Sequence, residues 1–519
     1  MQVIDNKALL FKTRNPDKYA LIPKHKILSE TNGTFEVLVY WGLEEVQVLR
    51  NLGVKDVPSP ITGRYGWPGR YSPMAHQRST ADFLTIHRKA FVFSEPGTGK
   101  TLSALWAADY LMSIGKVRRV LILCPLSIMQ SAWLGDLSSS VIHRSAVVAH
   151  HAQASRRIEM VQQDFEFVIA NYDGLNLIAS EVRNDGRFDL VIVDEANAYK
   201  TPTTKRWKAL ASILQPETRL WMMTGTPASQ SPADAYGLAK LVNPNGIPRF
   251  FTAWRDKVMH KVTMFKWAAK PAAPQLVHEA LQPAIRFTKA QCLDLPPVLT
   301  TTRLVPMTVQ QAKYYNTLKD RMSIQAAGET ITAVNAASGL SKLLQISCGA
   351  VYTDDKDVVE FDAGPRLSVL EEILEETDRK VLIFAMFRSS IDSIYNHLTK
   401  KGFKVELIHG GITPNKRADT IRRFQNEQDP RVLVMQPQAS AHGITLTAAD
   451  TVVFYGPLMS VEQYIQCIAR ADRKGQNSDK VTVIHIESSP VEKKMFTALS
   501  TKVVDNFTLT QMFETEINS

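Results

Sequence analysis

Short, mostly hydrophobic runs alternate with helix-like sequence along most of this chain. Apolar runs without polar alternation are typical of parallel strands, because such strands are buried on both faces of their sheet. The runs fall into two groups, residues 91–93, 120–123, 167–170, 190–193 and 220–223, and residues 381–384, 405–408, 432–435, 452–455 and 481–484. Strands that alternate with helices form βαβ units, so the pattern predicts an α/β fold with two parallel-sheet lobes.

Segments that break this pattern mark the expected domain organisation. The first 70 residues read as a small accessory domain, because residues 34–41 look strand-like and residues 43–52 look helical. A segment rich in Pro, Lys and aromatic residues separates the two groups of runs, and we expect it to be a mostly helical linker or insertion. The expected domains are residues 1–70, lobe 1 at 71–245, the linker at 246–299, lobe 2 at 300–490 and a C-terminal helical extension at 491–519.

Composition narrows the class of protein. At 519 residues the chain exceeds one ordinary core, which agrees with several domains. Its four cysteines form no CxxC pair, so neither a disulfide framework nor a zinc site is indicated. No apolar run reaches the ~18 residues of a membrane span, and the N-terminus lacks a signal-peptide pattern. The net charge of +10 is compatible with a polyanionic partner.

A glycine-rich segment between an expected strand and an expected helix carries the first candidate chemistry. Residues 94–101 read Ser-Glu-Pro-Gly-Thr-Gly-Lys-Thr, after the run at 91–93 and before a helical stretch at 102–111. That context favours a nucleotide-binding P-loop over a plain turn. In a P-loop the backbone around Gly97, Thr98 and Gly99 wraps the phosphates, Lys100 reaches the β- and γ-phosphates, and Thr101 binds Mg²⁺. ATP and Mg²⁺ are therefore the expected cofactors.

An acidic pair follows the run at 190–193. Asp194 and Glu195 stand at the expected carboxyl end of that strand, where the metal of a P-loop enzyme needs a second protein contact. We expect Asp194 to bind Mg²⁺, through water, and Glu195 to orient or deprotonate the attacking water. An acidic pair after a strand is more often a helix cap, but the P-loop upstream reverses that preference.

Two arginines near the C-terminus form the third candidate site motif. Arg470 and Arg473 are three residues apart on an expected helix, so they would share one face. Phosphoryl-transfer sites use arginine to stabilise charge on the transferred group. Without the P-loop, a solvated basic helix face would be the default interpretation.

Taken together, the motifs over residues 71–500 resemble superfamily-two helicases and, more closely, the SWI/SNF-type DNA-dependent ATPases. The resemblance implies two tandem RecA-like lobes, a DNA partner, and an ATP site divided between them. It also implies further site residues, namely Gln77 for adenine, Gly443 for the nucleotide, Gln466 for catalysis, and Pro125, Ser127, Tyr172, Arg388 and Thr445 for DNA.

The resemblance leaves several functions open. The first hypothesis is an ATP-driven translocase on double-stranded DNA, which would work on duplex or branched DNA and be a monomer when free. The second is a strand-separating helicase or branch-migration enzyme on the same fold. A DNA-binding scaffold with an inactive ATP site is disfavoured, because the P-loop, the acidic pair and both arginines are present. We expect a cytoplasmic protein of a bacterium or a virus-infected cell, or a nuclear one if the source is eukaryotic.

One basic segment has two interpretations. The segment from Arg255 to Lys270 contains several lysines, which are interleaved with Phe265, Trp267 and the preceding Trp254. Basic and aromatic residues together suit a surface that tracks nucleic-acid phosphates. An amphipathic helix with a solvated basic face explains the same residues, and the sequence does not separate the two interpretations.

Overall fold

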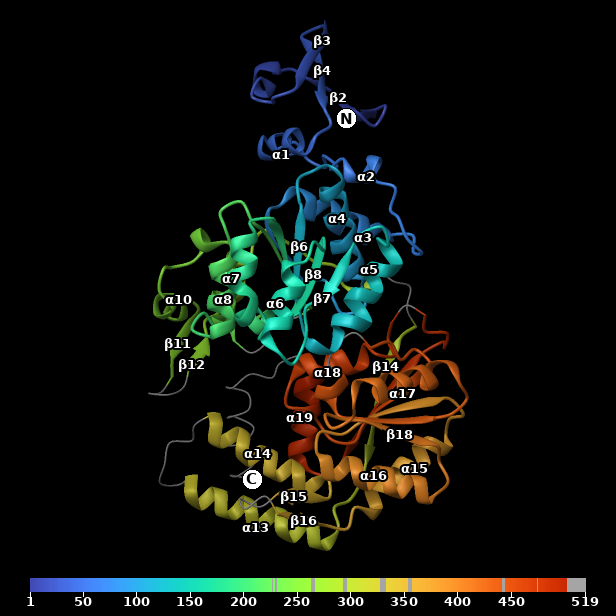
Figure 1. Ribbon diagram of the computed structural model, residues 1–519. Coiled ribbons are helices and arrows are strands. Elements are labelled where there is room, and N and C mark those ends of the chain that lie inside the picture. The colour runs from blue at the N-terminus through green and yellow to red at the C-terminus, as the bar shows by residue number, and fades with distance from the viewer. Residues whose placement is uncertain are drawn as a thin grey trace. The chain divides into compact units, whose positions relative to one another are not determined.

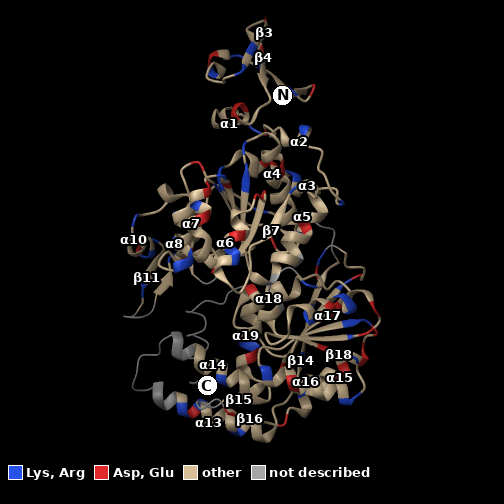
Figure 2. Cartoon of the chain, in the orientation of Figure 1, with Lys and Arg blue, Asp and Glu red and all other residues tan. Residues whose placement is uncertain are grey.

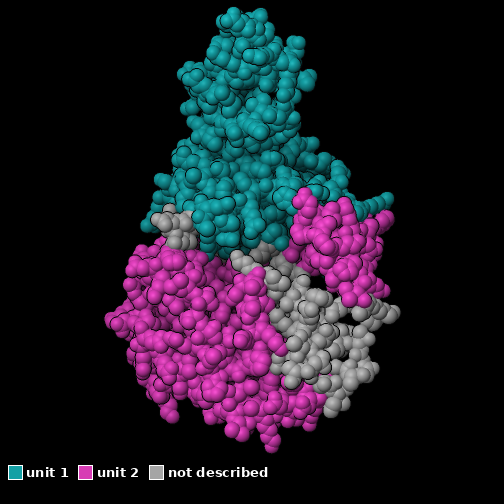
Figure 3. All heavy atoms as spheres, turned by 180° about the vertical axis from the view of Figure 1, so that it is seen from behind, with its two compact units in different colours: residues 1–227, 235–249, 278–292 teal, residues 228–234, 250–277, 293–519 magenta. Residues whose placement is uncertain are grey.

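The computed structural model describes residues 1–225, 227–228, 231–262, 267–292, 296–326, 333–352, 357–440, 444–473 and 475–501 (Figure 1). The chain divides into two compact units (Figure 3). The first contains residues 1–227, 235–249 and 278–292, and the second contains residues 228–234, 250–277 and 293–519. No helix in these described ranges combines the length and the apolarity that crossing a membrane requires.

The first unit is built on a parallel sheet of seven strands. Its order is β13-β5-β10-β9-β6-β8-β7, with β5 at Lys89–Val92, β6 at Arg119–Cys124, β7 at Ala146–Val148, β8 at Phe167–Asn171, β9 at Phe188–Val193, β10 at Arg219–Met223 and β13 at Ala284–Ile285. All five hydrophobic runs expected here are strands, which confirms that prediction. The short strands β7 and β13 carry too little pattern to be seen in the sequence.

Helices cover both faces of this sheet (Figure 1). One face carries α3 (Ala75–Ile86), α4 (Lys100–Ser113) and α5 (Gly135–Ser140), and the other carries α6 (Ala154–Gln162), α7 (Leu175–Asp185) and α8 (Lys205–Ile213). Helix α9 spans Ala235–Val242. Residues 103–112 of α4 are all buried, because this helix packs against the sheet, α3 and α5. The buried α4 fixes the position of the loop that precedes it.

The N-terminal residues form an antiparallel sheet of four strands with one helix. The strand order is β1-β2-β4-β3, and the elements are β1 (Gln2–Ile4), β2 (Ala8–Thr13), β3 (His25–Thr31), β4 (Thr34–Tyr40), α1 (Leu43–Asn51) and the short α2 (Ile61–Arg64). Leu9, Val37, Val39, Val46 and Leu49 make a core of their own. The strand and the helix expected in this region are both present.

The second unit contains a parallel sheet of six strands. Its order is β14-β21-β20-β17-β19-β18, with β14 at Val298–Leu304, β17 at Lys380–Phe384, β18 at Val405–Ile408, β19 at Val432–Met435, β20 at Ala449–Phe454 and β21 at Val481–Glu487. The five expected runs are again strands. The fold is therefore α/β with two RecA-like parallel-sheet lobes, as the sequence predicts.

Two hydrophobic clusters sandwich this second sheet. Leu382 and Phe384 of β17 face a cluster with α17 (Pro414–Asn426), α18 (Val461–Ile468) and α19 (Pro490–Ser500). Val381 and Ile383 face a cluster with α15 (Gly364–Glu375) and α16 (Arg388–Lys400). The remaining elements are α13 (Val309–Ala326), α14 (Ala333–Ser347) and a hairpin of β15 (Ala350–Tyr352) and β16 (Val358–Glu360).

The segment expected as a mostly helical linker also contains strands. Residues 246–299 hold α10 (Phe251–Val258), a hairpin of β11 (Met259–Lys261) and β12 (Trp267–Ala269), α11 (Ala273–Ala280) and α12 (Lys289–Cys292). They also hold β13, which joins the first sheet, and the start of β14, which joins the second. The proposed domain boundaries stay predictions, and residues 502–519 of the expected C-terminal extension lie outside the described residues.

A buried ion pair joins α15 to α19 in the second unit. The guanidinium Nη2 of Arg366 lies 2.7 and 2.8 Å from the carboxylate oxygens of Glu492, and both side chains are almost fully buried. The same carboxylate accepts the N–H groups of Ser488 and Ser489, which lie just before α19. Removing one member would therefore leave a buried charge without its partner.

We expect Glu492→Gln to lower the free energy of unfolding by about 3–5 kcal/mol, because Arg366 would keep an uncompensated buried charge. The double variant Arg366→Met/Glu492→Leu should recover most of that loss, since apolar residues of similar volume can replace a buried pair. Urea unfolding of the single and double variants measures both effects. A double variant less stable than Glu492→Gln would contradict this account.

His485 provides a pH-sensitive element in the same lobe. Its ring stacks on Phe496 of α19, with centroids 4.0 Å apart, and its Nε2 lies 2.9 Å from the Tyr464 hydroxyl. Burial lowers the pKa of His485 to about 4. The unfolded chain, with a histidine pKa near ~6.5, binds this proton more tightly than the folded chain does.

Stability should therefore fall as pH drops from about 6.5 towards 4, by up to about 3 kcal/mol from this residue. The variant His485→Phe should flatten that dependence, because it keeps the stack on Phe496 and removes the titrating group. Opening free energies of β21 from amide hydrogen exchange at several pH values measure the change. Replacing the exposed His151 by Gln is the matched control, and an unchanged pH dependence in His485→Phe would contradict the assignment.

Candidate active site

The loop between β5 and α4 has the geometry of a phosphate cradle. Gly97 and Gly99 adopt left-handed conformations, with φ of 89° and 79°. Gly99 is the N-cap of α4 and Lys100 is its first residue. The left-handed φ of Gly99 would strain any other residue, and a Cβ atom there would also displace the amide of Gln77, so glycine suits this position. The N-terminus of α4 thus opens onto the loop and favours a bound anion.

Side chains within the loop hold it closed. The Nζ of Lys100 donates to the carbonyl oxygens of Ser94 and Glu95, at 2.7 and 3.2 Å. The Thr98 hydroxyl donates to the Glu95 carbonyl at 2.9 Å. The side chain of Lys100 therefore reaches from the first turn of α4 back over the loop, and Thr101 follows it in that turn.

Ser94 occupies the position at which a P-loop usually begins with glycine, and the structure gives it a role. Its buried hydroxyl accepts the backbone N–H of Phe287 at 3.1 Å. The next residue, Glu95, donates its N–H to the Phe287 carbonyl at 3.0 Å and accepts the N–H of Lys289 at its carboxylate. The segment after β13 therefore fixes the first half of the loop.

The acidic pair lies at the carboxyl end of β9, in the same unit as the loop. Asp194 is buried, and its carboxylate accepts the indole N–H of Trp133 at 3.1 Å and the N–H of Glu195 at 3.0 Å. Burial raises the pKa of Asp194, while the charge of Lys100 and the Trp133 hydrogen bond oppose that rise. Glu195 has a left-handed φ of 46°, a strained conformation that is common at functional sites. The structure thus brings Lys100 and Asp194 within electrostatic reach.

Tyr172 lies beneath this acidic pair. The sequence resemblance suggests a DNA contact for it, yet its hydroxyl donates to the Asp194 carbonyl at 2.6 Å. Burial, together with nearby Asp194, raises the pKa of Tyr172 well above its ordinary value. Its hydroxyl therefore positions the acidic pair, which sequence reasoning did not anticipate.

A cavity of about 430 Å³ lies beside the N-terminus of α3. Its walls combine residues of α3 with the segment after β13, namely Ala75, His76, Ser79, Arg286, Phe287, Gln291 and Cys292. The rings of His76 and Phe287 are 5.8 Å apart, and His76 Nε2 lies 2.8 Å from the Thr98 carbonyl. Gln77 Nε2 donates to the Gly99 carbonyl at 3.4 Å. This cavity next to the phosphate cradle combines aromatic rings with hydrogen-bonding side chains, a lining that is suited to a planar base.

The candidate arginines do not lie on a helix, which corrects the sequence prediction. Helix α18 ends at Ile468, and Arg470 and Arg473 occupy the turns that follow. After Ile468 the N–H groups of Arg470 and Ala471 bond to carbonyls three residues earlier, so the chain forms turns instead of an α-helix. The Arg470 carbonyl accepts the N–H of the distant Leu446 at 2.9 Å. Arg470 is buried and its Nη1 donates to the Ile444 carbonyl at 3.1 Å.

The remaining predicted site residues differ in how far they are buried. Gln466 is buried on α18. Arg388 begins α16, is about half exposed and pairs with Asp392 at 2.9 Å. Pro125 follows β6 and leads into a 3-10 turn at Leu126–Ile128. Thr445 is partly exposed, while Gly443 and the side chain of Ser127 lie outside the described residues.

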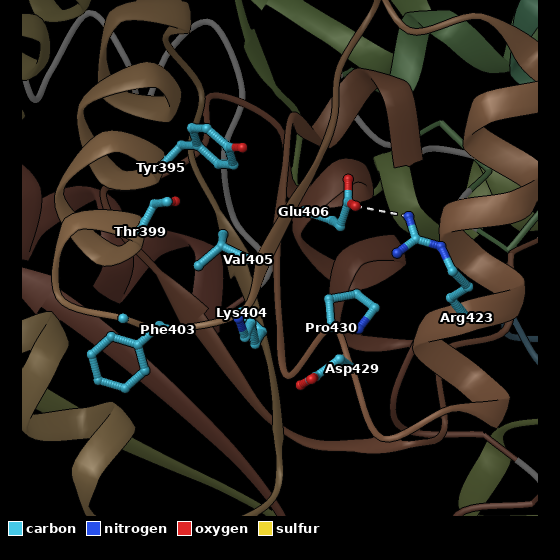
Figure 4. Close-up of a pocket in the computed structure, with 10 residues that line it drawn as sticks. Tyr395, Thr399, Phe403, Lys404, Val405, Glu406, Arg423, Asp429 and Pro430 are labelled. Carbon is cyan, nitrogen blue, oxygen red and sulfur yellow. Dashed lines mark hydrogen bonds and ion pairs between the residues drawn. The ribbon is translucent and has the colours of Figure 1, made fainter.

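A second cavity, of about 250 Å³, opens on the second lobe between α16 and α17 (Figure 4). Its walls include Tyr395, Phe403, Lys404 and Pro430, and the ion pair of Glu406 with Arg423 at 2.7 Å lies on one side. It surrounds the start of β18. Ligands of open α/β sheets bind at the carboxyl ends of the strands, so this cavity is on the wrong edge for the nucleotide.

Comparison with known proteins agrees with this geometry. The SNF2-related domain family matches residues 76–349, and the helicase conserved C-terminal domain matches residues 365–475. The chain is 24% identical to putative protein p41 of Acyrthosiphon pisum secondary endosymbiont phage 1, over 77% of this chain and 88% of that protein. It is 25% identical to the chromodomain-helicase-DNA-binding protein 1-like of Mus musculus, over 79% of this chain but 46% of that longer protein.

A solved structure is also similar. The Sulfolobus solfataricus SWI2/SNF2 ATPase core in complex with dsDNA is 20% identical, with a TM-score of 0.42, over 87% of this chain and 96% of that one.

Proposed function

Since this chain belongs to the SNF2-related family, we propose that it is an ATP-dependent translocase on double-stranded DNA. Membership makes it an ATP-hydrolysing, helicase-like enzyme that binds DNA. The observation that carries the ATP-hydrolysing part of the proposal is that one unit holds both the glycine-rich cradle and the buried acidic pair, with Lys100 acting electrostatically on Asp194.

The candidate site residues of the first lobe have the following roles in this proposal. The cradle N–H groups and Lys100 bind the phosphates, and the purine enters the cavity that His76 and Phe287 line. Thr101 and Asp194 hold Mg²⁺, which neutralises charge on the phosphates. Asp194 suits that role, because burial disfavours its ionised carboxylate and a bound cation would stabilise that negative charge. Glu195 orients the attacking water, and Tyr172 keeps the backbone of the acidic pair in place.

Residues of the second lobe complete the reaction in the proposal. Arg470 and Arg473 stabilise charge on the transferred phosphoryl group, with Gln466 beside them on α18. A site that needs both lobes couples hydrolysis to their relative movement. Pro125, Ser127, Tyr172, Arg388 and Thr445 are the proposed DNA contacts. Translocation along intact duplex is favoured over strand separation, because the described residues between Val432 and Arg473 contain no inserted hairpin.

We expect Lys100→Ala and Glu195→Gln to differ in effect. Lys100→Ala removes the charge that holds the phosphates, so both nucleotide affinity and turnover should fall. Glu195→Gln keeps the shape of the side chain, so nucleotide should still bind while turnover falls by about 10²–10⁴. A fluorescent ATP analogue and a phosphate-release assay separate the two quantities. Glu159→Gln, an exposed carboxylate on α6, is the control, and normal turnover in Glu195→Gln would remove that residue from the catalytic set.

The translocase proposal itself is tested by comparing two substrates. We expect duplex-stimulated ATPase activity and displacement of the third strand from a triplex, with little unwinding of a tailed duplex. Triplex displacement reports movement along intact duplex, whereas tailed duplex reports strand separation. Robust unwinding of the tailed duplex, at an ATP consumption similar to that of triplex displacement, would favour the strand-separating helicase instead.

A further inference from the structure

The basic segment with two interpretations is a helix followed by a hairpin. Helix α10 ends at Val258, and β11 and β12 pair antiparallel, with Met259 opposite Ala269 (Figure 1). Its charge is strongly one-sided, since the described part of residues 250–277 contains Arg255, Lys257, Lys261 and Lys270 but a single acid, Asp256 (Figure 2). A simple amphipathic helix does not describe this arrangement.

Contacts hold the helix and the hairpin as one platform. The Arg255 guanidinium lies 3.9 Å from the centroid of the Trp267 ring, which ties α10 to β12. The backbone N–H of Lys270 donates to the Val258 carbonyl at 2.9 Å, and its Nζ donates to the Asp256 carbonyl. The basic residues therefore sit on elements that constrain one another.

Aromatic rings lie on the outside of this platform. Trp254 and Val258 are buried on one face of α10. Phe250 and Phe251, at the start of the helix, are 65% and 45% exposed, and they are the only phenylalanines with such exposure among the described residues. Two adjacent, exposed aromatic rings on the same helix and hairpin as four basic residues match a ligand that offers both phosphates and flat bases.

We infer that α10 and the β11–β12 hairpin bind single-stranded DNA, as a contact separate from the motor motifs. Lysines attract the phosphates, and exposed aromatic rings stack on unpaired bases. Intact duplex offers phosphates but keeps its bases stacked inside, so it would leave the rings unused. The inference rests on the proposed function, because the platform would bind the single-stranded part of a tailed or branched DNA while the motor works on its duplex part.

Two variants and a matched control test this inference on the full chain. Phe250→Ala/Phe251→Ala removes the rings without changing charge, and Lys257→Glu/Lys261→Glu reverses two charges. Lys313→Glu/Lys400→Glu makes the same charge change at exposed positions on α13 and α16. Affinities are measured by fluorescence anisotropy for a blunt duplex and for the same duplex with a single-stranded tail of about 16 nucleotides, which covers the upper site size of common single-strand binders.

Wild-type protein should bind the tailed DNA more tightly than the blunt duplex. The phenylalanine variant should lose about ten-fold in affinity for the tailed DNA and less than about two-fold for the blunt duplex. The lysine variant should lose a similar factor on the tail, with a salt dependence that is shallower by about two phosphates. The conservative variant Phe250→Tyr/Phe251→Tyr should restore tail affinity, because it keeps both rings.

Equal losses on tailed and blunt DNA, or wild-type affinity of the phenylalanine variant for the tail, would overturn the inference. The same holds if the control pair weakens tail binding as much as Lys257→Glu/Lys261→Glu does. Failure of the proposed function would look different, because blunt duplex would then not stimulate ATP hydrolysis by the wild-type protein, whatever the affinities for the tail.

Discussion

The backbone between β5 and α4 is the constraint on which the candidate active site depends. Gly99 must be left-handed to start α4 where it does, and the side chain of Gln77 fills the space that a Cβ would need. Once α4 starts there, its own burial directs the helix N-terminus at the cradle. The position of Lys100 follows from these two facts, and with it the charge that faces Asp194.

The first half of the same loop is held by a distant part of the chain. Ser94 and Glu95 bond to the backbone of Phe287, 193 and 192 residues later in sequence. Ser94 stands where a P-loop usually has its first glycine. Its hydroxyl accepts the N–H of Phe287, a backbone group that would otherwise need another partner. Phe287 also lines the cavity beside α3, so the segment that holds the loop forms one wall of that cavity as well.

Particular residues show how far the sequence can predict this molecule. Leu190 to Val193 are buried on both faces of their sheet, so β9 is visible as an uninterrupted apolar run. Strand β13 has two residues and is partly exposed, so it carries no such run. The turn at Arg470 looks helical in the sequence, but the N–H of Arg470 bonds three residues back and its carbonyl accepts the N–H of the distant Leu446. Tyr172 likewise acts on Asp194 through a hydrogen bond across 22 residues, which no local pattern encodes. Motifs thus predict the chemistry, while contacts between distant segments decide its geometry.

Helix α3 connects the N-terminal domain to the glycine-rich cradle. At its start, His76 and Gln77 bond to the carbonyls of Thr98 and Gly99 in the cradle. Near its end, Asp82 pairs with Arg50 of α1 at 2.8 Å and also accepts the N–H of Ser59. Through Arg50 and Ser59, the N-terminal domain is therefore tied to the same helix whose first residues hydrogen-bond to the backbone of the cradle.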